Sequence, residues 1–132
     1  MNKRRVVITG LGVLAPNGNT TSEYWDSISK GKSGIGYITK FDAENLSVKI
    51  AGELSGFNTE DFFDRRDIKR LDPFTIYSLV TTEEALKQSN LDNSNVDMER
   101  VGVIYGTGVG GIQTLEEQHG IFSNRGQRRV SP

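Results

Sequence analysis

The sequence predicts an α/β fold, in which helices cover both faces of a sheet. Two short apolar runs rich in β-branched residues, 5–9 and 100–105, are each followed by a glycine-containing loop, as buried strands are. Segments with helical start and stop signals lie between these runs. Strands and helices that alternate in this way are typical of an α/β sheet.

The first helix is expected to begin after Thr20 and to end before Gly31. Thr20 and Glu23 have the spacing of a capping box, in which the threonine hydroxyl accepts from the N–H of residue 23 and the glutamate reaches back. The apolar side of the helix includes Trp25, which we expect in the core. Lys30 adds a positive charge in the last turn, and Gly31 is the residue that commonly follows a helix.

The middle of the chain is expected to hold short elements and then a long helix. Residues 31–46 are rich in loop-forming residues, and 47–52 alternate as a short edge strand does. Residues 58–70 suggest a short helix with a densely charged face. Asp72 as N-cap and Pro73 as the first helical residue mark the start of the long helix.

The long helix is apolar nearly all round in its first half and amphipathic in its second half. Such a helix is buried at one end and reaches the surface at the other. Phe74 and Tyr77, in the first half, are therefore expected in the core. Asn90 and the polar residues 92–95 are expected to end the helix before the second strand.

Composition excludes several kinds of site. The 132 residues fit one domain, and 16 basic against 17 acidic residues give a net charge of −1, which does not indicate a nucleic-acid partner. Cysteine is absent, so there is no disulfide framework, thiolate metal site or cysteine nucleophile. The single histidine, His119, cannot build a histidine-rich metal site, and we expect it exposed on a helix.

The sequence contains no targeting or membrane signal. The basic N-terminal residues precede a short apolar strand pattern rather than the apolar segment and cleavage site of a signal peptide. No run of 18 apolar residues is present, so we expect no transmembrane helix. A cytoplasmic protein without a membrane partner is the expectation.

Gly106, Gly108 and Gly111 spell the G-x-G-x-x-G pattern of a dinucleotide-binding turn. The turn follows an apolar run and precedes a helix start, but no acidic residue follows at the distance needed to bind the ribose. The better placed pair, Gly10 and Gly12, lacks a third glycine, and no Lys-Ser or Lys-Thr follows either cluster. A nucleotide-binding α/β module is therefore the less favoured alternative, and we expect the glycines to allow a specific neighbour to approach the backbone.

Motifs along the whole chain are more specific together than any of them is alone. They comprise residues 4–12, 16–19, 25, 31–35, 41–42, 51–52 and 106–111. Taken together they closely resemble the β-ketoacyl-[acyl-carrier-protein] synthases, and within that family the type II elongating enzymes. The resemblance extends over residues 3–132 and covers roughly the first third of the family's length.

The resemblance implies a thiolase-like fold with α-β-α-β-α layers, and a homodimer. Residues 1–132 are expected to be an incomplete N-terminal part of the N-terminal domain, with no second domain present. This expectation agrees with the strand pattern, because two buried strands are too few for a sheet that is covered on both faces.

The resemblance also implies an acyltransferase activity in fatty-acid elongation. A decarboxylating Claisen condensation joins malonyl-acyl-carrier protein to an acyl-enzyme thioester, with acyl carrier protein as the partner and no cofactor or metal. The family's cysteine and two histidines have no counterpart here, and His119 matches none of them. We therefore expect no catalytic residue in this chain, which should be inactive alone. A non-catalytic partner subunit of the chain-length-factor type remains the alternative.

Two sets of candidate site residues follow from the resemblance. The turn formed by residues 106–111, the glycine turn, lies in the family at the dimer interface near the acyl pocket. There Val109 matches an aliphatic residue that lines and gates the pocket, although an ordinary interface valine is an equally good interpretation. The residues of this set are Gly106, Gly108, Val109, Gly110 and Gly111.

The second set consists of basic residues that match carrier-protein docking residues, namely Arg66, Lys69, Arg70, Arg128 and Arg129. The first three have i, i+3 and i+4 spacing and would share one face of a helix. Without the resemblance, these residues would be interpreted as solvated surface, because nearby acids balance the charge. These acids are Glu60, Asp61, Asp64 and Asp67. Arg125 joins Arg128 and Arg129 in a basic patch without nearby acids.

Overall fold

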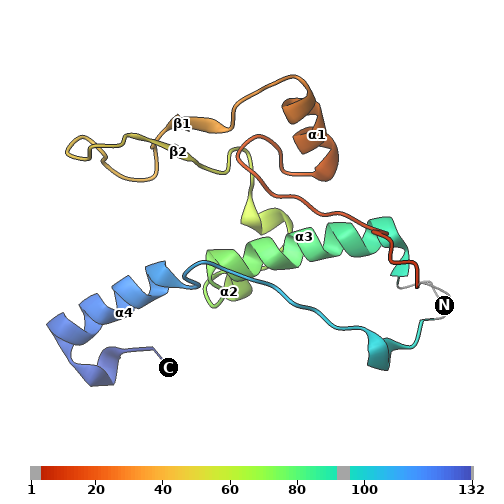
Figure 1. The fold of residues 1–132 in the computed structure, drawn as a ribbon. Coiled ribbons are helices and arrows are strands. Elements are labelled where there is room, and N and C mark those ends of the chain that lie inside the picture. The colour runs from red at the N-terminus through yellow and green to blue at the C-terminus, as the bar shows by residue number, and fades with distance from the viewer. Residues whose placement is uncertain (1–3, 92–95, 132) are drawn as a thin grey trace.

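The structure is a computed structural model that describes residues 4–91 and 96–131 (Figure 1). Its elements lie in the order α1 (Thr21–Ser29), β1 (Ile35–Tyr37), β2 (Ile50–Gly52), η1 (Thr59–Asp61), α2 (Arg65–Ile68), α3 (Pro73–Ser89), η3 (Met98–Arg100), α4 (Ile112–Arg125) and η4 (Gln127–Arg129). The predicted polar segment at 92–95 lies outside the described residues.

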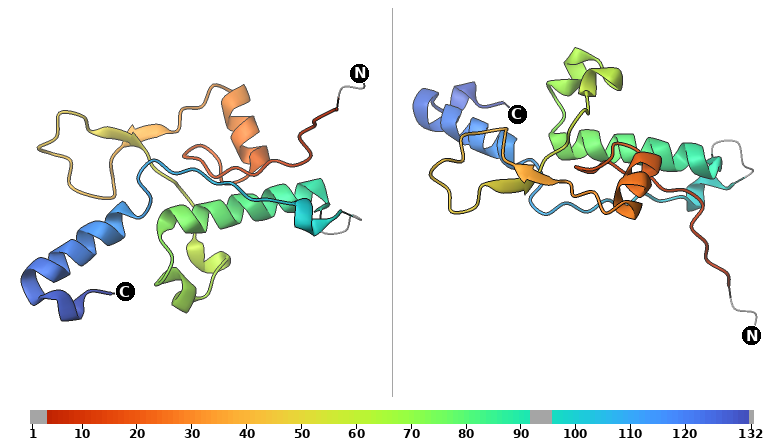
Figure 2. Two further views of the ribbon diagram at one scale, coloured as in Figure 1. Left: turned by 60° about the horizontal axis from the view of Figure 1, so that its bottom comes forward. Right: turned by 90° about the horizontal axis from the view of Figure 1, so that it is seen from above.

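Helix α3 is the centre of the arrangement, and the other segments lie around it (Figures 1 and 2). Ile76 and Val80, both in its first half, are the buried apolar side chains of the described part of the chain, at 3% and 7% exposure. The prediction that the first half of this helix is the buried end is therefore confirmed. Phe74 and Tyr77, which we expected in the core, are only half-buried.

The boundaries of α1 confirm the predicted capping signals. The Thr20 hydroxyl accepts from the Glu23 N–H at 3.2 Å, and a Glu23 carboxylate oxygen accepts from the Asn19 N–H at 2.9 Å. The glutamate therefore reaches back one residue further than a standard capping box requires. At the other end Gly31 has a φ of 66° and donates to the Ile28 carbonyl, which closes the helix as predicted.

The expectation that Trp25 lies in the core is wrong. Its side chain is 67% exposed, and Ile28 in the same helix is 40% exposed. The amphipathic pattern predicts an apolar side of the helix, but no residue of α1 is buried by the described segments.

The expectation of buried strands at 5–9 and 100–105 is also wrong for the described residues. Both segments lack ladder hydrogen bonds, and the described sheet consists of β1 and β2. Their apolar side chains are open to solvent, with Val6 at 94% and Ile104 at 99% exposure. A strand is stabilised by backbone hydrogen bonds to a neighbouring strand, and the described chain places none beside either segment.

Strands β1 and β2 pair antiparallel, with Ile35 opposite Gly52 and Tyr37 opposite Ile50. The predicted edge strand at 47–52 is confirmed for its last three residues, whereas β1 lies in the segment that we expected to be loop. Beyond the strands, Glu53 accepts from the N–H and hydroxyl of Thr39 and from the Lys40 N–H, at 2.6–3.2 Å. This carboxylate closes the long loop of the hairpin.

The charged segment before α3 forms two short elements rather than the single helix expected at 58–70. Asn58 caps η1 through the Glu60 N–H, and Asp64 caps α2 through the N–H groups of Arg66 and Asp67. Each capping side chain starts a new turn, which divides the segment. Helix α3 then begins at Pro73 and ends at Ser89, and the C-cap residue Asn90, with a left-handed φ of 53°, ends the helix as predicted.

Candidate functional site

The glycine turn connects an extended segment on α3 to the first turn of α4. Residues 101–107 run back along α3 in the direction opposite to that helix (Figures 1 and 2). The hydroxyls of Tyr105 and Thr81 lie 3.3 Å apart and hold this segment against α3. The chain then turns at Gly110, where φ is 75° and the N–H donates to the Thr107 hydroxyl at 3.2 Å. Only glycine adopts this conformation readily.

Gly111 allows the close approach of one specific neighbour, the carboxylate of Asp72. A Cβ at Gly111 would lie 2.6 Å from the carboxylate carbon of Asp72, a distance that real side chains do not tolerate. The same carboxylate accepts a hydrogen bond from the Thr114 hydroxyl in the first turn of α4. The sequence indicates Asp72 only as an N-cap of α3, yet it makes no side-chain cap there. Its contact with α4 is tertiary and has no local sequence signal.

The remaining residues of the glycine turn face open space. An added Cβ at Gly106 or Gly108 would meet no atom of the described chain within 4 Å, and Val109 is 71% exposed. The close approach that we expected at these glycines is thus seen at Gly111 alone. The outer side of the turn has room for a further neighbour.

The geometry argues against a phosphate site at either glycine cluster. An anion at the start of α4 would meet the Asp72 carboxylate, and like charges repel each other at such short range. At the first cluster, a Cβ on Gly12 would overlap the Thr81 carbonyl, so this glycine allows the loop to pack on α3. The nucleotide-binding alternative has no support from the described residues.

The first basic cluster, Arg66, Lys69 and Arg70, is exposed on α2 and the turn that follows it. The N–H groups of Arg70 and Leu71 both donate to the Asp67 carbonyl, so the helical turn continues past α2 and keeps the three residues close. This cluster is called the α2 basic cluster below.

The acids near the α2 basic cluster are engaged elsewhere or unpaired. Glu60 forms its ion pair with Arg65 at 3.2 Å, Asp61 accepts from Asn58, and Asp64 caps α2. Within residues 4–91 and 96–131, the three basic residues of the cluster form no ion pair. Their charges therefore remain available to a partner of opposite charge.

The second cluster, Arg125, Arg128 and Arg129, lies at the end of α4 and in η4 and is called the C-terminal basic cluster. All three side chains are exposed, and the described chain offers them no ion pair. Gln118 accepts from the Ser131 N–H at 2.7 Å, which folds the segment after η4 back onto α4. His119 is exposed on α4, as predicted.

The described residues add no candidate for metal chemistry or membrane insertion. No group of three histidine, cysteine or carboxylate side chains in them is arranged to hold a metal ion. None of the helices in this part of the chain has the length and apolarity to cross a membrane.

Comparison with known proteins agrees with the resemblance noted in the sequence. The family model described as the β-ketoacyl synthase N-terminal domain matches residues 3–132. The chain belongs to this family. The β-ketoacyl synthase match therefore includes both basic clusters and the glycine turn.

Curated β-ketoacyl synthase relatives match almost the whole chain. A protein of Staphylococcus aureus strain N315 named 3-oxoacyl-[acyl-carrier-protein] synthase 2 is 45% identical over 129 residues, 98% of this chain and 31% of the relative. A protein of Synechocystis with the same name is 38% identical over 132 residues, 100% of this chain and 32% of the relative. The chain thus spans about a third of the length of these relatives.

Solved ketosynthase structures share the fold. A type II polyketide acyl-carrier protein in complex with its ketosynthase, AntDE:AntF, matches with a TM-score of 0.77 and 28% identity, over 98% of this chain and 33% of that chain. The ishigamide ketosynthase/chain length factor matches with a TM-score of 0.74 and 22% identity, over 98% of this chain and 32% of that chain. The chain has part of the thiolase-like fold of these β-ketoacyl synthases.

Proposed function

We propose that residues 1–132 are the N-terminal part of a 3-oxoacyl-[acyl-carrier-protein] synthase of type II, which elongates fatty acids by decarboxylating condensation. The observation that carries this proposal is the family match over residues 3–132, together with relatives of that name at 38–45% identity. The cysteine and histidines of the reaction are assigned to the part of the relatives that this chain does not span. The contribution of this chain is to bind the partner and shape the acyl pocket.

The glycine turn is proposed to face the acyl chain and a second copy of the protein. Val109 is exposed at its tip, and the apolar side chains of Ile112 and Leu115 continue from it along α4 at 51% and 68% exposure. Exposed apolar side chains grouped on one element are typical of an interface. A homodimer that covers α4 would enclose Val109 and place it against a bound acyl chain.

The two basic clusters are proposed to dock the acyl carrier protein, an acidic partner. Their side chains are exposed, and no described acid pairs with them. Complementary charge at the rim of an interface mainly raises the association rate and makes that rate sensitive to salt. The AntDE:AntF structure, in which a type II polyketide acyl-carrier protein is in complex with its ketosynthase, supports a carrier protein as the partner.

The test is a condensation assay on the full-length enzyme with acyl- and malonyl-carrier protein. Formation of 3-oxoacyl-carrier protein is expected. Reversal of charge in Arg70→Glu and Arg128→Glu should raise the KM for the carrier by roughly five- to tenfold with little change in kcat. High salt should reduce this difference in KM from the wild type. Lys30→Glu is the matched control, because Lys30 lies at the end of α1, away from both basic clusters in sequence, and already pairs with Asp26.

Each outcome of the assay has a clear meaning. Absence of product from the full-length protein would contradict the synthase assignment. If the protein forms no product by itself but changes the chain length of the product made by an added catalytic ketosynthase, it would instead be a chain-length-factor subunit. Equal effects of the Lys30 and Arg70 variants on the carrier KM would contradict the docking assignment.

A further inference from the structure

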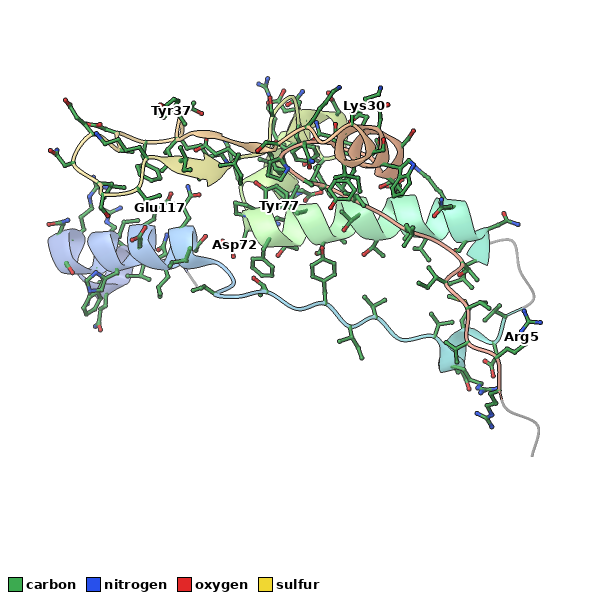
Figure 3. All side chains as sticks on the ribbon, turned by 45° about the horizontal axis from the view of Figure 1, so that its top comes forward. Arg5, Lys30, Tyr37, Asp72, Tyr77 and Glu117 are labelled. Atoms are coloured by element: carbon green, nitrogen blue, oxygen red, sulfur yellow. The ribbon has the colours of Figure 1, made fainter. Side chains whose placement is uncertain are left out.

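Asp72 lies between the two parts of the candidate site. It follows Arg70 of the α2 basic cluster by two residues, and it precedes the first residue of α3. Its carboxylate does not cap α3. Instead it accepts a hydrogen bond from the Thr114 hydroxyl and packs against Gly111. Figure 3 shows Asp72 between the first turns of α3 and α4. One side chain thus connects the docking segment to the end of the glycine turn.

Other contacts between the start of α4 and the segments α2 and α3 are sparse. A cavity of about 290 Å³ lies between α2, α3 and α4, with Lys69, Leu71 and Gln113 among its lining residues. Helix α4 extends away from α3 beyond its first turn (Figure 1). Close packing therefore does not hold the start of α4 in place, and a polar contact carries more of this task.

The charge of Asp72 suits the position. The first turn of α4 has no acidic residue of its own, and its N-cap, Gly111, has no side chain. The Asp72 carboxylate, from the residue before α3, supplies the negative charge that a helix N-terminus favours. An ionised acceptor also makes a shorter and stronger hydrogen bond to a hydroxyl than a neutral acceptor does.

We propose that Asp72 is a positioning residue that sets the acyl-chain specificity of the enzyme. Through Gly111 and Thr114 it holds the glycine turn, and with it Val109, in one position relative to the acyl pocket. The proposal rests on the pocket role of Val109 in the proposed function. In the proposed function Asp72 contacts neither the carrier protein nor the acyl chain, and it acts only through the glycine turn.

The test compares Asp72→Ala, Asp72→Asn and Thr114→Val in the full-length enzyme. The measured quantity is the ratio of kcat/KM for a long and a short acyl-carrier substrate. We expect Asp72→Ala to change this ratio about five- to tenfold. A smaller change in the same direction is expected for Asp72→Asn, which keeps an acceptor, and for Thr114→Val, which removes only the donor. Asp67→Ala is the control, because it removes the same charge from the neighbouring helix without touching α4.

Amide hydrogen exchange provides a readout that does not depend on activity. Asp72→Ala and Thr114→Val should increase the exchange rates of the amides at 107–112 by about tenfold, while those of α1 stay unchanged. If the wild-type enzyme performs no condensation, the proposed function fails, and exchange still tests the link. Faster exchange with an unchanged substrate ratio would overturn the specificity role. Unchanged exchange in both variants would overturn the link itself.

Discussion

Glu84, in the second half of α3, accepts a hydrogen bond from the backbone N–H of Thr21, with 2.7 Å between Oε1 and the nitrogen. Its other oxygen accepts from the Val13 N–H at 2.8 Å. Thr21 is the first residue of α1, where backbone N–H groups have no partner within the helix. One carboxylate therefore fixes both the N-terminal loop and the start of α1 on the central helix.

Replacement of Glu84 by Ala should lower the free energy of unfolding by about 2 kcal/mol, since two hydrogen bonds to a charged group are lost. Glu83→Ala is the matched control, because Glu83 forms only an exposed ion pair with Lys87. The control should cost less than about 0.5 kcal/mol. Urea denaturation of the full-length protein measures both. Equal losses would show that the Glu84 contacts contribute nothing beyond surface charge.

Val109→Phe should narrow the range of acyl chains that the enzyme accepts. The side chain is 71% exposed at the tip of the glycine turn, so a larger ring would extend into the proposed acyl pocket rather than disturb a core. We expect roughly tenfold lower kcat/KM for long acyl-carrier substrates and little change for short ones. Val109→Ile serves as the control of nearly conserved shape. A uniform decrease for all chain lengths would argue against a pocket position.

Acid should loosen the β1–β2 hairpin. The Thr39 hydroxyl, with the N–H groups of Thr39 and Lys40, holds the pKa of Glu53 below its usual 4.5, while partial burial opposes this shift. A lowered pKa means that the ionised form supports the fold above pH 4.5. This support is lost as the pH falls through the lowered value. The protection of the Thr39 and Lys40 amides from hydrogen exchange, relative to their intrinsic rates at each pH, should decrease over that range in the wild type but not in Glu53→Gln.

Residues 1–132 produced alone should not unfold cooperatively. The buried apolar side chains of the described residues are Ile76 and Val80, whereas Val6, Trp25 and Ile104 are largely exposed. So small a core cannot offset the conformational entropy of an ordered chain. Calorimetry should give a broad transition, with aggregation and binding of an apolar dye. A sharp transition of a monomer would contradict this expectation.

Local signals in the sequence predict the boundaries of α1 and α3 well, although not those of the charged segment at 58–70. Thr20 and Gly31 delimit α1, and Pro73 and Asn90 delimit α3, as the structure confirms. Such signals work because they satisfy the backbone groups at a helix end within a few residues. The family assignment also follows from the sequence, since motifs spread over the chain are specific together and the family model matches residues 3–132.

Strand pairing and burial depend on segments that are distant in sequence, and here the local pattern is insufficient. Residues 5–9 and 100–105 have strand-forming composition but no described neighbour to pair with, and Trp25 has an apolar helix side but nothing packed on it. Their composition favours strand pairing and burial. Both require that another segment lie beside them to form hydrogen bonds or cover the apolar side chains.

The sequence by itself determined the family and the ends of α1 and α3. The tertiary structure alone decided where two carboxylates act: Glu84 on the start of α1, and Asp72 on Gly111 and Thr114 of the glycine turn and α4. A carboxylate accepts hydrogen bonds from any donor that the fold brings near it, so its partner is set by the path of the whole chain rather than by its neighbours in sequence.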